Sequence, residues 1–298
     1  MNAIAKYALS IRSSLNKPSK TKFIDVETMG DVVPKVVHQT YSTKKLPIEI
    51  KNNIAKMKSE NPDWIFKLYD DNDINLFITK NYPQLLSFYK KINPKYGAAK
   101  ADFFRYLVMY KQGGVYLDIK SGLNRPLNEI TADIDHYVLS NWPRSYPIIM
   151  QGLHNGISNP MGEYQQWHII SVKGHPYLEQ VINNVCNNIT HYNPFIHDFG
   201  SWGVFNLTGP IAYSEAIYPI LNQYPHSYFK DHLEIGLEYC AINKINKLAG
   251  HHAIFKGIHY SKLTDSVVLK SMPTNLLFKL LRPSISLLKK MLKNVSKS

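Results

Sequence analysis

Residues 95–127 restrict the fold of this chain more than any other segment, because a helical pattern, a glycine stop and a short strand pattern follow directly on one another. The helix is expected to begin near Pro94 and to end at Gly113-Gly114, since proline suits a first turn and glycine adopts a left-handed cap at little cost. Beyond the glycines, apolar residues alternate with residues that carry functional groups: Val115, Leu117 and Ile119 with Tyr116, Asp118 and Lys120. This period of two predicts a strand that turns the first set into a core and the second set together onto the other face.

Asp102 and Arg105 lie three residues apart, so both are expected to project from one face of the helix. A carboxylate and a cation on the helix would then face a carboxylate and a cation at the strand end, Asp118 and Lys120. This combination suits a phosphorylated, hydroxyl-rich ligand. Taken alone, Asp102 and Arg105 would be explained more simply as an ion pair on a helix surface, which stabilises little.

The rest of the chain alternates short apolar runs with helical patterns. Strands are expected at 32–41, 64–69 and 137–141, and helices at 48–60, 74–81 and 84–91. Such alternation predicts an α/β fold with a mainly parallel sheet covered by helices on both faces. Ligands of these sheets bind beyond the carboxyl ends of the strands, where polar residues gather in this sequence: His38, Gln39, Thr40, Asp70 and Asp118.

The same residues carry a family resemblance. The pattern A-x-x-x-D-x-x-R, then G-G-x-Y-x-D and Pro-Leu, spans Ala98 to Leu127 and resembles the glycosyltransferases with a DXD sugar-binding region, family 32. Residues 33–40, 61–64 and 68–71 resemble the first two strands of that family, which includes fungal Golgi mannosyltransferases and bacterial capsule and lipopolysaccharide sugar transferases. The spacing from Asp102 to Asp118 is also similar to that of the large clostridial glucosylating toxins.

The resemblance implies a GT-A-like, Rossmann-type, mainly parallel sheet flanked by helices, with additional C-terminal helices. It implies a glycosyltransferase domain at 32–270, preceded by a basic arm at 1–31 and followed by a basic amphipathic helix at 271–298. The residues expected to bind the nucleotide-sugar donor are His38, Gln39, Thr40, Asp102, Tyr116 and Asp118. Those expected to act in catalysis are Asp118, Arg105 and Lys120, the two cations stabilising the diphosphate leaving group.

One position departs from the family pattern. The DXD motif reads Asp118-Ile119-Lys120, so a lysine replaces the carboxylate that usually binds the divalent metal in this family. A lysine there can neutralise the diphosphate as a point charge. Alternatively, Lys120 turns away and Mn²⁺ or Mg²⁺ binds through Asp118 and other ligands, with His259 as the candidate. Two further strings, Asp71-Asn72-Asp73 and Asp133-Ile134-Asp135, are interpreted as a helix start, with Asp71 or Asp73 at its cap, and as a polar connection rather than metal sites.

The net charge of +13 is concentrated at the two ends of the chain. Residues 1–22 carry five Lys/Arg and residues 270–298 carry seven, without an acid in either segment, which leaves a nearly neutral body. This distribution favours an anionic membrane surface as partner over a nucleic acid. Apolar residues from Leu277 to Val295 recur at helical spacing among the lysines, which is typical of an interfacial helix, although a terminal helix packed on the domain also fits. No run is long enough to span a membrane, so we expect a cytoplasmic protein, peripheral on the inner face of the plasma membrane.

Together with these features, the resemblance implies a bacterial nucleotide-sugar-dependent hexosyltransferase, of the retaining type, that acts on a polysaccharide or lipid-linked glycan in capsule or lipopolysaccharide synthesis. Two alternatives stay open: a non-catalytic sugar-nucleotide or polysaccharide-binding protein, and a glucosylating effector that modifies a protein. A dinucleotide oxidoreductase is disfavoured because the first strand, 33–42, is not followed by G-x-G-x-x-G. The aromatic segment 141–166 is expected to be either a lid or acceptor wall or a plain connection.

Overall fold

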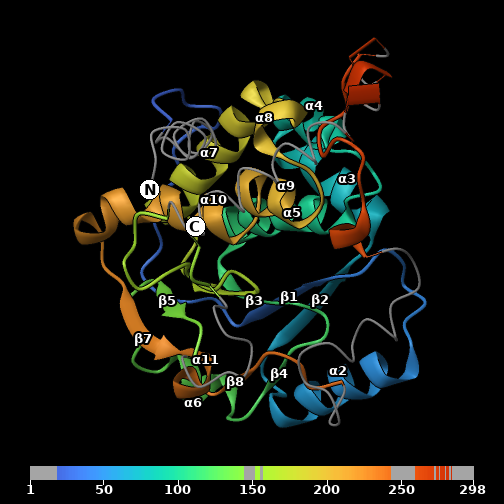
Figure 1. The fold of residues 1–298 in the computed structure, drawn as a ribbon. Helices are drawn as coiled ribbons and strands as arrows, with labels where there is room; N and C mark the ends of the chain where they lie inside the picture. Colours follow the sequence, from blue (N-terminus) through green and yellow to red (C-terminus); the bar gives the residue numbers. More distant parts are fainter. Residues whose placement is uncertain are drawn as a thin grey trace, which may run out of the picture.

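The computed structural model describes residues 19–143, 152–154, 157–242, 259–271, 273–274, 276–278, 280–281 and 283. Its central sheet has the strand order β2-β1-β3-β6 (Figure 1). β1 (Val36–Thr40) pairs in parallel with β2 (Ile65–Tyr69) and β3 (Gly114–Leu117), and β6 (His168–Ser171) pairs antiparallel with β3. The expected α/β fold with a mainly parallel sheet is therefore confirmed.

The remaining described strands form two separate two-stranded sheets. The other strands are β4 (Gly122–Leu123), β5 (Val138–Asn141), β7 (Ser227–Asp231) and β8 (Leu237–Glu238), of which β4 pairs with β8 and β5 with β7. The helices are α2 (Ile48–Glu60), α3 (Asp71–Asn81), α4 (Leu86–Lys91), α5 (Gly97–Gln112), α6 (Leu127–Thr131), α7 (Pro176–His191), α8 (Pro194–His197), α9 (Gly200–Leu207), α10 (Pro210–Ile217) and α11 (His232–Ile235). Short 3₁₀ turns are η1 (Pro83–Leu85), η2 (Tyr218–Gln223) and η4 (Tyr260–Lys262).

Two hydrophobic cores form, one on each face of the sheet. The larger core packs α3, α5, α7, α9 and α10 together, and these helices gather on one side of the strands, with α2 on the other (Figure 1). Alternation along β1 and β3 divides the side chains as expected, because Val37, Val115 and Leu117 enter the smaller core while Tyr116 enters the larger. Helix α5 is the centre of the larger core, since every residue from Asp102 to Tyr110 is buried.

The glycine stop acts as the sequence indicates. Gly113 caps α5 at a φ of 64°, and Gly114 continues at 101°, both in the region that L side chains rarely adopt. A Cβ on Gly114 would also collide with the carbonyl oxygen of Val36 on the neighbouring strand. The two glycines thus allow the chain to leave α5 and enter the sheet directly beside β1.

The strand after the glycines is shorter than the alternation predicts. β3 ends at Leu117, and residues 118–121 form a turn in which the Ser121 amide donates to the Asp118 carbonyl oxygen at 2.8 Å. Asp118 and Lys120 therefore occupy a turn at the end of the strand rather than one face of a longer strand. The two other acidic strings lie at a helix start and in a connection, as expected, but the cap of that helix is Asp70 rather than Asp71 or Asp73. Asp71-Asn72-Asp73 begins α3, capped by Asp70, and residues 133–135 connect α6 to β5.

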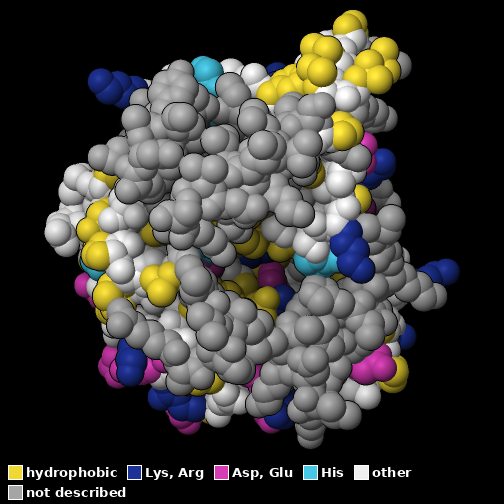
Figure 2. Space-filling view, in the orientation of Figure 1, with side chains coloured by type: hydrophobic (Ala, Val, Ile, Leu, Met, Phe, Trp, Pro, Cys, Tyr) yellow, Lys and Arg dark blue, Asp and Glu magenta, His cyan; other side chains and the backbone are white. Residues whose placement is uncertain are grey.

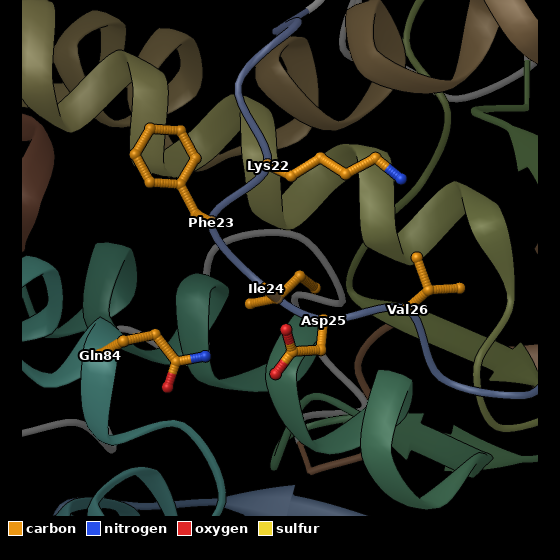
Figure 3. A pocket seen from close by; sticks show the side chains of 6 residues that line it. All are labelled: Lys22, Phe23, Ile24, Asp25, Val26 and Gln84. Atoms are coloured by element: carbon orange, nitrogen blue, oxygen red, sulfur yellow. The ribbon is translucent and has the colours of Figure 1, made fainter.

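The described part of the basic arm, residues 19–31, lies against the helical layer. The amides of Ser19 and Phe23 donate to Asn184 and Asn183 of α7, both at 2.8 Å, and Ile24 joins the larger core. A cavity of about 450 Å³ lies along this arm and is lined by residues 22–26 of the arm and Gln84 (Figure 3). None of these lining residues belongs to the group of charged side chains at the end of β3.

Buried histidines make the stability of this fold depend on pH. Burial lowers the pKa of four of them from 6.5, to about 3 for His168 and to about 4 for His38, His175 and His232. The unfolded chain therefore binds more protons than the folded one between pH 6.5 and 4, so stability is full above pH 6.5 and is lost as the pH falls through that range. Each histidine contributes up to about 1.4 kcal/mol per pH unit.

We expect the free energy of unfolding, measured by urea denaturation, to fall steeply between pH 7 and pH 5. His38→Gln should reduce the slope with pH, whereas the exposed His191→Gln, the matched control, should leave it unchanged. Burial raises the pKa of Asp102 to about 6, which has the opposite sign, but one carboxyl opposes four imidazoles. Equal stability at both pH values would contradict the assignment of neutral buried imidazoles.

Candidate active site

The predicted meeting of helix and strand end occurs at Arg105. From α5, its guanidinium Nη2 lies 3.0 Å from Asp118 Oδ1 and 3.2 Å from Asp102 Oδ1. Its Cζ also lies 4.7 Å from the centre of the Tyr116 ring on β3, a cation–π distance. One cation thus joins the two carboxylates that the sequence places on different elements.

Two residues that the sequence analysis gave no role complete the surroundings of Arg105 and Asp102. Arg105 Nη1 donates to the Gln166 carbonyl oxygen at 2.6 Å and also contacts the Gln166 side-chain oxygen. Gln166 Nε2 in turn donates to Asp102 Oδ1 at 3.2 Å, and Thr208 Oγ1 donates to Asp102 Oδ2 at 3.1 Å. Gln166 immediately precedes the segment that pairs with the end of β3, where the Asp118 amide donates to the Trp167 carbonyl oxygen at 2.8 Å.

The carboxylates differ in their access to solvent. The side chains of Asp102 and Arg105 are each 5 % exposed, whereas that of Asp118 is 23 % exposed. Burial raises the pKa of Asp102 to about 6, against the opposing effect of Arg105. Burial also disfavours the charge on Arg105, but Tyr116, Asp118 and Asp102 together hold its pKa above the ordinary value. Asp102 and Arg105 therefore form an interior support, and Asp118 is the carboxylate that a ligand can reach.

Lys120 turns toward Asp118 rather than away from it. Its Nζ lies 3.7 Å from Asp118 Oδ2, donates to the Tyr239 hydroxyl at 2.9 Å and lies 4.1 Å from the centre of the Tyr239 ring. Burial disfavours the lysine charge, but Tyr239 and Asp118 together raise the pKa of Lys120 above its ordinary value. The backbone fixes the same contact, because the Ala241 amide donates to the Lys120 carbonyl oxygen at 2.9 Å.

The end of β1 contributes less than the sequence predicts. His38 is fully buried, with Nδ1 3.0 Å from the Tyr69 hydroxyl and Nε2 3.1 Å from the Gly113 carbonyl oxygen, so both ring nitrogens serve the interior. Thr40 Oγ1 lies 3.0 Å from the Tyr116 hydroxyl and supports the ring beneath Arg105. Gln39 is 3 % exposed, and its buried side-chain nitrogen lacks a hydrogen-bond partner among the described residues.

Among the described residues, the contacts of His259 are local to a 3₁₀ turn. The His259 ring caps η4, where Nδ1 lies 2.7 Å from Ser261 Oγ and accepts from the Ser261 amide at 3.3 Å. Within the described part of the chain, His, Cys, Asp and Glu residues do not come together in threes or more as a metal ion requires. The predicted pairing of Asp118 with His259 as metal ligands therefore stays a prediction.

The described residues of the aromatic segment 141–166 are anchored to the domain. Glu215 of α10 accepts from the Ser158 amide at 2.5 Å and from its hydroxyl at 2.7 Å, and the Tyr164 amide donates to Ser214 at 2.7 Å. Glu163 accepts from Trp142 Nε1 at 2.7 Å, and the Trp142 ring packs 5.0 Å from that of Tyr239. Trp142 of this segment therefore packs against the tyrosine that contacts Lys120. Figure 2 shows a hollow near the centre of this face, between α5 and strands β1 and β3 of Figure 1, with charged and hydrophobic side chains at its floor.

Comparison with known proteins shows what this chain is similar to. Residues 21–137 match the model of the glycosyltransferase sugar-binding region containing a DXD motif. Inositol phosphoceramide mannosyltransferase 3 of Schizosaccharomyces pombe is 31 % identical over 182 residues, which cover 61 % of this chain and 44 % of that protein. The initiation-specific alpha-1,6-mannosyltransferase of Candida albicans is 26 % identical over 237 residues, which cover 73 % and 60 %.

These alignments span about half the length of the curated relatives. Among solved structures, the PaToxG glycosyltransferase has a TM-score of 0.45 at 17 % identity, covering 74 % of this chain and 79 % of that one. The matched segment, 21–137, contains Asp102, Arg105, Asp118 and Lys120. By these comparisons, residues 21–137 of this chain are similar to the glycosyltransferase sugar-binding region that contains a DXD motif.

Proposed function

We propose that this protein transfers a hexose from a nucleotide-sugar donor to a glycan or lipid-linked acceptor. The observation that carries the proposal is the position of Asp118, a partly exposed carboxylate held at the end of β3 by the buried Arg105 and, through it, by Asp102. Carboxylates fixed in this way accept hydrogen bonds from sugar hydroxyls without reorganising when the donor binds. The two named relatives are mannosyltransferases, which makes a mannose-type donor the first candidate.

For the acceptor, we propose a polysaccharide or lipid-linked glycan of bacterial capsule or lipopolysaccharide synthesis, as the sequence resemblance implies. The name of one relative, an inositol phosphoceramide mannosyltransferase, supports an acceptor that carries a lipid. In the reaction, the bond between the anomeric carbon and the diphosphate oxygen breaks, and the acceptor hydroxyl oxygen bonds to that carbon and loses its proton. Retention of configuration is the stereochemistry that the resemblance implies.

The exposure of each site residue indicates its role in the proposed reaction. Asp118 reaches the donor hydroxyls, while Asp102 and Arg105 hold Asp118 from inside and Tyr116 lies beneath Arg105. The positive charge nearest to Asp118 on its other side is Lys120, which we assign to the diphosphate as it gains charge. In DXD relatives a divalent cation, Mn²⁺ or Mg²⁺, supplies positive charge to the diphosphate when it is bound.

A panel of sugar nucleotides, with GDP-mannose first, tests the proposal. Binding should raise the melting temperature of the wild-type protein, and nucleoside diphosphate should be released when a glycan or lipid-linked acceptor is added. Asp118→Asn keeps the shape of the side chain but removes its charge, so we expect turnover to fall by at least about a hundredfold with little change in melting temperature. Tight binding without release under all conditions would favour the non-catalytic alternative, and near-normal turnover by Asp118→Asn would reject the site. Transfer to a protein acceptor instead of a glycan would favour the effector alternative.

Arg105 gives a second prediction, in which stability and activity separate. Arg105→Ala leaves the buried Asp102 without its cation, so the free energy of unfolding at pH 7 should fall by about 3–5 kcal/mol. The free energy of unfolding of Arg105→Lys should lie between those of the wild-type protein and Arg105→Ala, because an ammonium cannot reach Gln166, Asp102 and Asp118 at once. Urea denaturation measures both, with the surface variant Lys56→Ala as control. The sequence-based expectation that Arg105→Ala lowers kcat more than donor affinity is tested by kinetics of the same variants. A loss confined to KM would assign Arg105 to ground-state binding.

The C-terminal segment supports a membrane surface as a further partner. The described residues between 273 and 283 are helical, and Phe278 is buried within 5.4 Å and 5.8 Å of the Phe195 and Phe199 ring centres. Its neighbours are exposed by 44 to 68 %: Leu276, Leu277, Leu280 and Leu281. Figure 2 shows hydrophobic side chains gathered on the projecting segment that is red in Figure 1.

Such a leucine cluster, in a tail with seven basic residues and without an acid, suits an anionic lipid surface. We therefore propose that the protein binds the inner face of the plasma membrane through this tail, which would bring the site to a lipid-linked acceptor. Among the described helices, none has both the length and the apolar character needed to cross a bilayer.

Vesicle sedimentation tests this proposal. The full chain should bind vesicles of phosphatidylglycerol and phosphatidylcholine, bind vesicles of phosphatidylcholine alone weakly, and dissociate as salt is raised. Leu276→Ser combined with Leu280→Ser should weaken binding by about tenfold, because apolar burial is lost while every charge is retained. Leu76→Ser, an equally exposed leucine on α3, is the matched control. Unchanged vesicle binding by the double variant would contradict the proposal and indicate that this helix only packs on the domain.

A further inference from the structure

Both oxygens of Asp118 already face a cation that belongs to the protein. Oδ1 lies 3.0 Å from Arg105 Nη2, and Oδ2 lies 3.7 Å from Lys120 Nζ. In a DXD site, a divalent cation would have to approach this same carboxylate. Here it would meet a guanidinium on one side and an ammonium on the other, and like charges at such distances repel strongly in a partly buried site.

We propose that Lys120 is a resident cation that binds the donor diphosphate directly, so that nucleotide binding at this site does not require a divalent metal. The proposal rests on the proposed function, since it assigns a role toward the nucleotide that such a transferase uses. It deepens that function by naming the chemistry that recognises the diphosphate: one ammonium, in a fixed position, next to the carboxylate that holds the sugar.

The residues present do not fit the metal that the family implies. Mn²⁺ and Mg²⁺ prefer carboxylate and other oxygen ligands. The motif offers one carboxylate, Asp118, because its second position is Lys120. The other nearby carboxylate, Asp102, is 5 % exposed and uses its oxygens for Arg105, Gln166 and Thr208. In the described residues, the acids and histidines do not form a group of three that could hold an ion.

The charge at the motif supports the same conclusion. Replacing a carboxylate by an ammonium changes the local charge from −1 to +1, a difference of two, which equals the charge of one divalent cation. Asp102 and Asp118 are balanced by Arg105 and Lys120. A diphosphate that enters this balanced site gains an attractive ammonium, whereas it would be repelled by a second carboxylate that lacked its metal.

Tyr239 holds Lys120 in the required position. The hydroxyl accepts from Nζ at 2.9 Å, and the ring centre lies 4.1 Å from the same atom, so the ammonium is held by two features of one side chain. The residues that follow Lys120 also bind the segment that carries Tyr239, because Ser121 Oγ donates to the Tyr239 carbonyl oxygen at 3.1 Å and Gly122 pairs with Glu238. A lysine confined in this way loses little conformational entropy when it binds an anion. Tyr239 is accordingly a positioning residue.

Calorimetric titration with GDP and UDP, in EDTA and then in Mn²⁺, tests the proposal on the full chain. For the wild-type protein we expect Kd to differ by less than about threefold between the two conditions, because the ammonium supplies the charge in both. Lys120→Asp should weaken binding in EDTA by at least about tenfold and regain it in Mn²⁺, since it restores the second carboxylate. Lys120→Gln, which removes the charge without adding a ligand, should bind weakly in both conditions. Tyr239→Phe should weaken binding in EDTA without regaining it in Mn²⁺.

A second measurement does not depend on nucleotide. The electron paramagnetic resonance signal of free Mn²⁺ should be unchanged by the wild-type protein and reduced by Lys120→Asp. If Lys120→Asp fails to fold, nucleotide binding by Lys120→Gln and Tyr239→Phe is compared with that of the wild-type protein instead. Wild-type binding that disappears in EDTA and returns with Mn²⁺ would overturn the role of Lys120 and leave the proposed function standing. Absence of binding to any nucleotide in either condition would overturn both.

Discussion

The buried charge on Arg105 is the interaction on which the site depends. The side chain of Arg105 is 5 % exposed, and its two terminal nitrogens are held by Asp102, Asp118 and Gln166, while its buried Nε lacks a hydrogen-bond partner among the described residues. These partners come from α5, from the end of β3 and from the approach to β6. One cation therefore fixes the relative position of three chain segments, and Asp118 is held where a ligand can reach it because Arg105 cannot move away.

The two glycines make this arrangement possible at the level of the backbone. α5 is buried along most of its length and must end abruptly if the following strand is to run beside β1. Gly113 and Gly114 provide that reversal with positive φ angles and with room for the Val36 carbonyl oxygen. The fifteen residues between Asp102 and Asp118 thus contain the last part of one helix, a sharp reversal and one short strand. They bring two acids, one on the helix and one after the strand, to one guanidinium.

The sequence predicts this part of the site because it is local. Asp102, Arg105 and Asp118 lie within one helix–strand unit, and periodicity alone assigns their faces. Gln166, Thr208 and Tyr239 could not be found in the same way, because they reach the site from segments about 60 to 120 residues further along the chain, through contacts that no local pattern encodes. His38 shows a different limit. Its place at a strand end favours a ligand role, but tertiary packing placed a tyrosine hydroxyl and a carbonyl oxygen at its two nitrogens. The alternation to Lys120 likewise overestimated β3, because hydrogen bonds across the 118–121 turn replace the ladder after Leu117.

The turn has a chemical consequence that a longer strand would not have. In an extended strand, Asp118 and Lys120 would project from the same face two residues apart, side by side. In the turn, Lys120 is instead directed to Tyr239 and at the same time to the second oxygen of Asp118. The carboxylate is then held from two sides, by a buried guanidinium and by an ammonium with 11 % exposure. A lysine at this position is compatible with the fold because the β8 segment supplies the hydroxyl and the aromatic face that a desolvated ammonium needs. The departure from the DXD motif is thus built into the structure by residues on two separate segments.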